Sequence, residues 1–151
     1  MRIGIIIIFH DNEAEIDAHH CIECFKHAHK LEICLVDNNS RDNTQNILKE
    51  IKEECYNVTL VNIKKIKSDA AAVRAGARFM INNFDLKHLG FVSTNSINKT
   101  SFGVNGMIKE LMENQEQISI QCISSSNLKK TNRAIFQNIF SVMECFEIAS
   151  Q

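Results

Sequence analysis

Apolar runs of buried-strand type alternate with helix-like segments along this chain, and this alternation restricts the fold more than any other feature. The first run, Ile3 to Phe9, is rich in isoleucine and stops at the polar residues His10 to Glu13. Further runs, each following a segment with helical spacing, are Ile33 to Val36, Val58 to Ile63 and Leu89 to Val92. Such alternation predicts an α/β fold with a mostly parallel sheet, helices on both faces and right-handed crossovers.

The segments between the runs have the apolar spacing of amphipathic helices. The expected helices cover Ala14 to Ala28 with Asp11 or Asn12 as N-cap, the residues after a cap at Ser40 or Asp42, Ala70 to Phe84, and Val104 to Met112. The stripes expected to be buried are Ile47, Leu48, Ile51 and Cys55 on the second helix, and Val73, Ala77, Met80, Ile81 and Phe84 on the third.

The last third of the chain continues the pattern. We expect a polar loop over Ser93 to Ser101 and a fifth strand over Ile118 to Ile123. A C-terminal amphipathic helix is expected within residues 131–149, from Arg133 to Ala149. Its apolar face would pack on the sheet and pair with a second copy, so a homodimer through this helix is one expected assembly.

Composition is that of one soluble globular domain, residues 1–151, with 44% hydrophobic residues and a formal net charge of -1. The near balance of charge argues against a nucleic-acid partner and against a broad footprint for anionic membranes, and leaves a local basic patch open. The first apolar run is too short for a signal peptide or a membrane span. We therefore expect no transmembrane segment, a cytoplasmic location and six cysteines that remain thiols.

The carboxyl ends of parallel strands are where such sheets bind ligands. The segments that follow the expected strands are His10 to Glu13, Asp37 to Asp42, Lys64 to Asp69 and Ser93 to Ser96. Carboxylates and amides can pair with the edges of a base and a ribose, and the cations of the third segment, with Arg74 and Arg78, can neutralise phosphates. This rim suits a nucleotide diphosphate; the alternative for Lys64 to Lys67 is a solvated loop.

Three motifs in this order resemble glycosyltransferase family 2, the inverting nucleotide-sugar transferases with the GT-A fold. Residues Ile33 to Thr44, ICLVDNNSRDNT, resemble its V-D-D-G-S-x-D-x-T signature. Upstream, IIIIFHDNE resembles the first strand and its I-P-x-Y-N-E ending, with Asn12 and Glu13 retained and Phe9 in place of the proline. Downstream, KSDAAAVRAGARFM resembles the G-K-G-A-A-x-R-x-G helix start of the dolichol- and polyprenyl-phosphate sugar transferases, matching at Ala71, Ala72, Arg74 and Gly76.

The resemblance implies a GT-A (Rossmann-like) domain, truncated here because the chain ends soon after the fifth expected strand. In the family, carboxylates after the second strand hold the base and ribose, and the helix after the third strand begins near the diphosphate. Combined with the strand-end chemistry, this gives an expected nucleotide-binding set of His10, Asn12, Glu13, Asp37, Asn38, Lys67 and Arg74. For Asp42, ligand contact and a role in the first turn of a helix both stay open.

This chain departs from the family pattern at the metal-binding motif and at the catalytic base for the acceptor. Where members carry the D-x-D motif that binds Mg²⁺ or Mn²⁺, this chain has Ser93, Thr94 and Asn95, and hard cations prefer charged oxygen ligands. The G-K-G residues are replaced by Ser68, Asp69 and Ala70. No catalytic base is assigned, because the late carboxylates Glu144 and Glu147 fall on the expected C-terminal helix. We therefore expect no certain cofactor and a degenerate metal motif.

Two functions follow. The first is a transferase that takes a UDP- or GDP-sugar and passes the sugar with inversion to a hydroxyl or a lipid phosphate. The second is a catalytically inactive GT-A domain, a pseudoenzyme that binds a nucleotide or a partner protein. A separate metal hypothesis places His20, Cys24 and His27 near one helix face for Zn²⁺, although structural zinc sites draw ligands from two separated elements. A polar helix surface is the alternative there.

Overall fold

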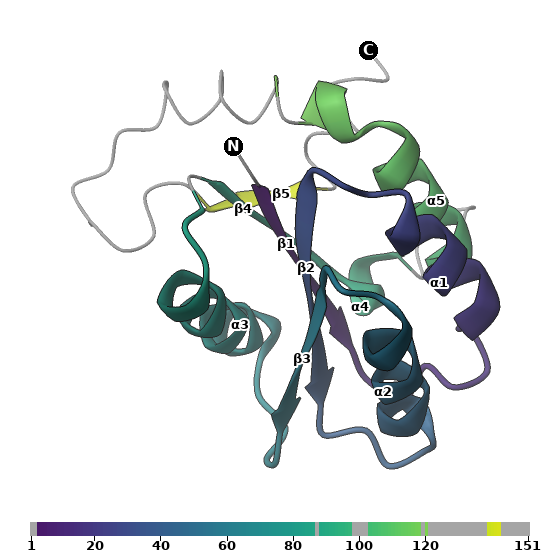
Figure 1. Cartoon of the computed structure of the whole chain (residues 1–151). Helices are drawn as coiled ribbons and strands as arrows, with labels where there is room; N and C mark the ends of the chain where they lie inside the picture. The colour runs from purple at the N-terminus through teal and green to yellow at the C-terminus, as the bar shows by residue number, and fades with distance from the viewer. Residues whose placement is uncertain (1–2, 87, 98–102, 119, 121–138, 143–151) are drawn as a thin grey trace.

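The computed structural model describes residues 3–86, 88–97, 103–118, 120 and 139–142, and the chain forms a parallel sheet with helices on both faces (Figure 1). Within these residues the sheet has five strands in the order β3-β2-β1-β4-β5, and all of the pairings are parallel. The strands are β1 (Ile3–Phe9), β2 (Leu31–Asn38), β3 (Val58–Ile63), β4 (His88–Ser93) and β5 (Ile139–Ser141). The expected α/β fold with a parallel sheet is confirmed.

The helices cover the sheet unequally. The described helices are α1 (Ala18–Lys26), α2 (Thr44–Glu54), α3 (Asp69–Asn83), α4 (Thr94–Ile97) and α5 (Gly103–Glu113). Figure 1 shows α3 alone on one face and α1, α2 and α5 together on the other. Each crossover between β1, β2, β3 and β4 carries one of these helices, as parallel strands require.

Strand β1 lies at the centre, and every one of its side chains is buried. Ile5, Ile7 and Phe9 pack in the cluster beneath α1, α2 and α5, whereas Ile6 and Ile8 pack against α3. A strand covered on both faces is apolar at every position rather than at alternate positions, which explains its uninterrupted isoleucine run.

Gly76 allows α3 to approach the sheet closely. A Cβ atom at this position would lie 3.0 Å from Cγ2 of Ile6 and 3.1 Å from Cγ2 of Val36. The glycine that the family motif shares is thus explained by packing of the helix on β1 and β2.

The helices differ from the expected ones in three places. Residues Thr94–Ile97 form α4, although a polar loop was expected over Ser93 to Ser101. Helix α1 begins at Ala18, and its N-cap is Asp17, whose side chain accepts a hydrogen bond from the backbone N–H of His20. The expected caps, Asp11 and Asn12, lie well before it. Helix α2 begins at Thr44 after Asn43, so Ser40 does not cap it.

Ile81, expected on the buried face of α3, is 40% exposed. The buried face of α3 comprises Ala72, Val73, Gly76, Ala77 and Met80, and Ile81 lies outside this stripe. The expected helix itself is otherwise reproduced to within one residue at each end.

Two expectations near the C-terminus are wrong where the structure describes the residues. Residues 115–118 and 120 are helical, so the expected strand over Ile118 to Ile123 does not begin there. Within the expected last helix, Ile139–Ser141 instead pair with β4 as strand β5. Gly90 makes room for this strand, because a Cβ atom there would lie 2.6 Å from the Phe140 ring. The rest of that helix, and a homodimer through it, fall outside the described residues.

Candidate functional site

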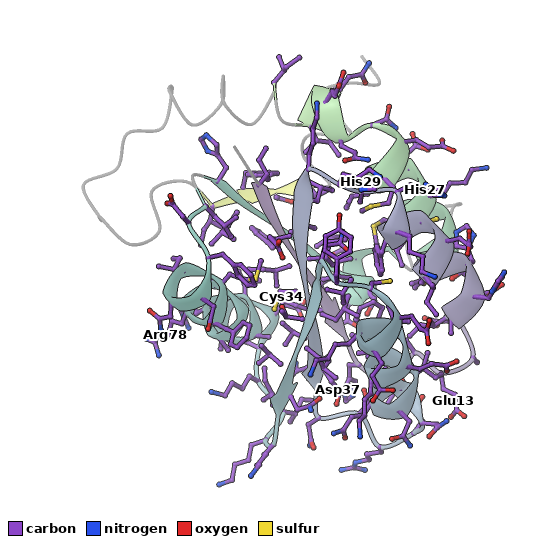
Figure 2. All side chains as sticks on the ribbon, viewed as in Figure 1. Glu13, His27, His29, Cys34, Asp37 and Arg78 are labelled. Carbon is purple, nitrogen blue, oxygen red and sulfur yellow. The ribbon has the colours of Figure 1, made fainter. Side chains whose placement is uncertain are left out.

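The loops after β1, β2, β3 and β4 meet at the carboxyl edge of the sheet, as the parallel topology requires. Phe9 is in register with Asp37, Asp37 with Asn62, and Ile8 with Ser93. Figure 2 shows Asp37 and Glu13 toward this edge, whereas His27 and His29 lie toward the opposite edge. The sequence motifs that follow the strands therefore come together in space.

The first contact joins the ends of β1 and β2. Nδ1 of His10 lies 2.7 Å from the carbonyl oxygen of Asn38. Because a carbonyl only accepts, Nδ1 carries the proton and donates it. Nε2 of the same ring lies 3.2 Å from the carboxylate of Asp11, so this second ring nitrogen also faces a hydrogen-bond acceptor.

The second contact joins β2 to the loop after β3. The side chain of Asn38 donates from Nδ2 to the carbonyl oxygen of Lys67 at 2.8 Å, and its Oδ1 accepts from the Lys67 N–H at 3.0 Å. Asn38 is buried. Both ends of this amide are therefore used to hold the backbone of one residue.

The third contact joins β1 to β4 through Asn12. Oδ1 of Asn12 accepts from the Thr94 hydroxyl at 2.9 Å and from the His10 N–H at 2.8 Å. Nδ2 of Asn12 donates to Glu15 at 2.6 Å. The backbone N–H of Asn12 donates to the Thr44 hydroxyl at 2.8 Å, which adds the start of α2.

Asp37 is occupied by its own turn. Its carboxylate accepts from the hydroxyl of Ser40 at 2.5 Å and from the Ser40 N–H at 3.3 Å. The Ser40 hydroxyl also accepts from the Asp11 N–H at 3.0 Å. Asp11 and Asn39 both have a positive φ, 51° and 53°, a conformation that Asp and Asn tolerate better than most residues do. The turn after β2 is thus fixed against the turn after β1.

Glu13 and Asp42 form a reciprocal pair of contacts at the rim. The Glu13 N–H donates to Asp42, and the Asn43 N–H donates to Glu13, both at 3.1 Å. Desolvation raises the pKa of Asp42, but hydrogen bonds from the Thr44 side chain and N–H and from the Glu13 N–H outweigh it. The pKa of Asp42 therefore lies below its ordinary value, and its role as a carboxylate at the start of α2 has direct support.

The expected nucleotide-binding residues divide into two groups. Asn12, Asp37 and Asn38 are buried, and internal hydrogen bonds already use their side chains. The others, which reach the surface at least in part, are His10, Glu13, Lys67 and Arg74. Arg74 lies on the exposed side of α3, and none of the network contacts described above includes it. Ligand contact by all seven stays a prediction.

A cavity of about 340 Å³ opens beside this network, between the end of β4 and the start of α3. Its lining includes Asp69, Val73, Ser93, Ser96 and Ser141. The volume lies in the range of small-molecule sites. Sequence reasoning missed Ser141, because it assigned this residue to a helix remote from the site.

The degenerate metal motif does not fit a hard divalent cation. The Thr94 hydroxyl is used by Asn12, and Oγ of Ser93 accepts from the Asn95 N–H at 3.3 Å. Asp69, at the start of α3, is a carboxylate in contact with the motif, through a 3.5 Å hydrogen bond from Asn95. One carboxylate and two committed hydroxyls form a poor donor set for Mg²⁺ or Mn²⁺. Across the described residues, no three His, Cys, Asp or Glu side chains are placed to share a metal ion.

Of the residues in the zinc hypothesis, His20 has other contacts. Nε2 of His20 lies 3.0 Å from the Asn105 carbonyl oxygen and 3.6 Å from Sγ of Cys24. His27 lies at the C-cap of α1. His20 thus tethers α1 to α5, and a polar helix surface accounts for this part of the chain.

Comparison with known families supplies the identity. The model of glycosyl transferase family 2 matches residues 5–84, more than half of the chain. The chain belongs to glycosyltransferase family 2. The match contains the two turns after β1 and β2 and the whole of α3, so the family segment carries the network from His10 to Lys67. The α/β architecture of this family 2 domain is GT-A-like.

Solved structures and curated proteins add little to the family match. S. aureus TarS 1-349 in complex with UDP is 14% identical, with a TM-score of 0.49 over 62% of this chain and 27% of that chain. S. aureus TarS is 13% identical, with a TM-score of 0.49 over 62% of this chain and 16% of that one. The mannosyltransferase PcManGT from Pyrobaculum calidifontis, in complex with GDP-Man and Mn2+, is 22% identical, with a TM-score of 0.41 over 52% and 24% of the two chains. This chain therefore spans about a quarter or less of each, and no curated protein matches it.

The described part of this family 2 chain contains no candidate membrane-spanning helix. None of its helices combines the length and the apolar character that a bilayer span needs.

Proposed function

We propose that this chain binds the nucleotide part of a UDP- or GDP-sugar at the carboxyl edge of its sheet. One observation carries the proposal: a continuous series of hydrogen bonds runs from Lys67 through Asn38, His10 and Asn12 to Thr94. It fixes the loops after β1, β2, β3 and β4 in one surface before any ligand arrives. Family membership supports a nucleotide sugar as the class of ligand.

Within this proposal the two groups of residues have different roles. Asn12, Asp37 and Asn38 hold the loops, and the partly or fully exposed His10, Glu13, Lys67 and Arg74 contact the ligand. A cation near a diphosphate strengthens binding through charge-assisted hydrogen bonds, so Lys67 and Arg74 are assigned to the phosphates. Asp37 already accepts two hydrogen bonds from Ser40, so we assign its carboxylate to the turn rather than to the base.

We further propose that nucleotide binding does not depend on a divalent cation. The donor set at Ser93, Thr94 and Asn95 supports this, because it contains no carboxylate and two of its hydroxyls have internal partners. This favours the inactive nucleotide-binding domain over the transferase. The family match over residues 5–84 favours the second candidate, transfer of the sugar to a hydroxyl or a lipid phosphate.

Calorimetric titration with UDP and GDP, each with and without Mn²⁺, tests the proposal. We expect binding to one of them that Mn²⁺ changes little. Arg74→Ala should weaken it about tenfold, as loss of a charge-assisted hydrogen bond does. The matched control is Arg78→Ala, which removes an exposed arginine one turn further along α3 and should leave the affinity unchanged.

Each other outcome is informative. A large gain in affinity with Mn²⁺ would contradict the metal-independent site, and equal losses in the two arginine variants would contradict the role of Arg74. Absence of binding to both nucleotides would overturn the proposal. Release of free sugar or sugar transfer from a UDP- or GDP-sugar by the purified chain would establish the transferase instead.

A further inference from the structure

The loop between β3 and α3 exposes an aliphatic side chain among lysines. Lys64, Lys65 and Lys67 are all exposed, and Ile66 between them is 61% exposed. A single exposed isoleucine is ordinary on a protein surface. Here its neighbours on both sides carry positive charge, so the loop presents an apolar tip surrounded by cations.

The loop is held in place at its base. The buried side chain of Asn38 binds both backbone polar groups of Lys67, at 2.8 and 3.0 Å. Immediately after Lys67, Ser68 is the N-cap of α3, which begins at Asp69, and the Ser68 hydroxyl oxygen accepts from the Ala71 N–H. A loop anchored at this end loses less conformational entropy when it meets a partner.

The residues that follow this loop along the chain also carry mostly positive charge. From Lys64 to Arg78 the sequence contains five Lys or Arg and one acidic residue, Asp69, although the whole chain has a net charge of -1. The ion pairs His10–Asp11 and Lys30–Glu116 involve none of these five cations. Within the described parts of the chain, the five cations therefore have no carboxylate partner, and the loop is a local positive patch on a weakly acidic protein.

An anionic lipid surface matches this combination of chemistry. Lysines next to such a surface are attracted to lipid phosphates, and an aliphatic side chain gains by entering the boundary between headgroups and acyl chains. A single-stranded nucleic acid would instead use aromatic side chains for base stacking, and residues 64–67 contain none.

We propose that Lys64, Lys65 and Ile66 form a contact site for an anionic bilayer surface, with Ile66 inserted and the two lysines at the phosphates. This inference goes beyond nucleotide binding and does not depend on it. Because the loop follows β3 at the carboxyl edge, it would turn that edge toward the membrane.

Co-sedimentation of the full chain with vesicles tests the proposal. One set of vesicles contains phosphatidylcholine alone and the other also contains phosphatidylserine. We expect binding to the second set only, and weaker binding at high salt, because the screening length falls to about 3 Å at 1 M. Lys64→Glu with Lys65→Glu should reduce the partition coefficient at least about 25-fold, at about fivefold for each lysine. Ile66→Ser should reduce it about tenfold.

The matched control is Lys49→Glu with Lys52→Glu, which makes the same change of charge on the exposed side of α2. It should retain most of the binding. All substituted positions are exposed, and a thermal melt checks that each variant folds. Equal binding to both kinds of vesicle, or equal losses in both double variants, would overturn the proposal. So would binding to a poly(U) strand that exceeds vesicle binding and is unaffected by Ile66→Ser, since the patch would then be a polyanion site.

Discussion

The hydroxyl of Thr94 donates to Oδ1 of Asn12 across 2.9 Å, and both side chains are buried. This bond joins the start of α4 to the loop after β1, 82 residues earlier in the chain. It lies in the middle of the degenerate metal motif. The motif residues have thus become part of the scaffold that holds the carboxyl edge together.

Thr94→Val should lower the free energy of unfolding by about 1 kcal/mol, the typical net value of one hydrogen bond. The loss stays small because Asn12 Oδ1 keeps the His10 N–H. Thr94→Asp should lower the free energy of unfolding further, because it places a carboxylate at a position that is 1% exposed and directed toward an acceptor oxygen. Urea unfolding measures both, with Thr94→Ser as the control that keeps the hydroxyl. A Thr94→Asp protein as stable as wild type would contradict the buried bond.

Asn57→Ala should lower the free energy of unfolding by about 2 to 3 kcal/mol without changing nucleotide affinity. The reason is that Nδ2 of Asn57 donates to the carbonyl oxygens of Phe25, Ala28 and Leu31, at 3.1, 3.0 and 3.4 Å. These contacts hold the turn from α1 to β2, at the edge opposite the proposed site.

Asn57→Asp should lower the free energy of unfolding more than Asn57→Ala does, because a carboxylate would face the same carbonyl oxygens. Asn46→Ala, at an exposed position on α2, is the control and should change stability little. If Asn57→Asp proved as stable as wild type, the three contacts would not support the turn.

Asp42→Ala should lower stability at neutral pH by about 1 kcal/mol, as loss of a side-chain acceptor at a helix start does. The folded-state pKa of Asp42 is below its ordinary value of 3.8, so its contribution is present above that pH. It is lost as the pH falls through the lower folded pKa. Unfolding curves at several pH values should therefore show the two proteins converging in acid. A difference that grows toward low pH would contradict the assigned sign.

Cys21 and Cys34 should resist alkylation in the folded protein. Burial raises the pKa of each thiol to about 12, so almost no thiolate is present near neutral pH. Cys24 is half-buried and should react faster than either. Iodoacetamide labelling followed by peptide mass spectrometry reads each cysteine separately, and unfolding in urea should abolish the differences. Rapid labelling of Cys34 in the native protein would mean that the α3 face of the sheet opens.

The sequence predicted the first four strands and the helices between them because both signals are local. A strand buried on both faces is a continuous apolar run, and β1 is such a run. The expected third helix matches α3 closely, because Ser68 caps it and its apolar residues recur at helical spacing. The same signals located the carboxyl-edge loops that form the candidate site.

The C-terminal region was predicted wrongly because its local signal is ambiguous. Alternating isoleucines at 118 and 120 suit a strand, yet both residues are helical, with Ile118 buried and Ile120 68% exposed. Residues Ile139–Ser141 have helical spacing with their neighbours, but they pair with the open edge of β4. The hydrogen bonds of a sheet edge outweigh a weak helical preference, and they depend on a partner far away in sequence.

The sequence by itself determined the order of strands and helices, the family, and which loops lie at the carboxyl edge, because periodicity and motif spacing are properties of the chain alone. The tertiary structure decided which polar groups remain available to a ligand. Asn12, Asp37 and Asn38 match or flank the binding motifs, yet their side chains are directed into hydrogen bonds with Thr94, Ser40 and Lys67. A hydrogen bond between residues many positions apart forms only when the fold brings donor and acceptor within about 3 Å, and local sequence does not encode that distance.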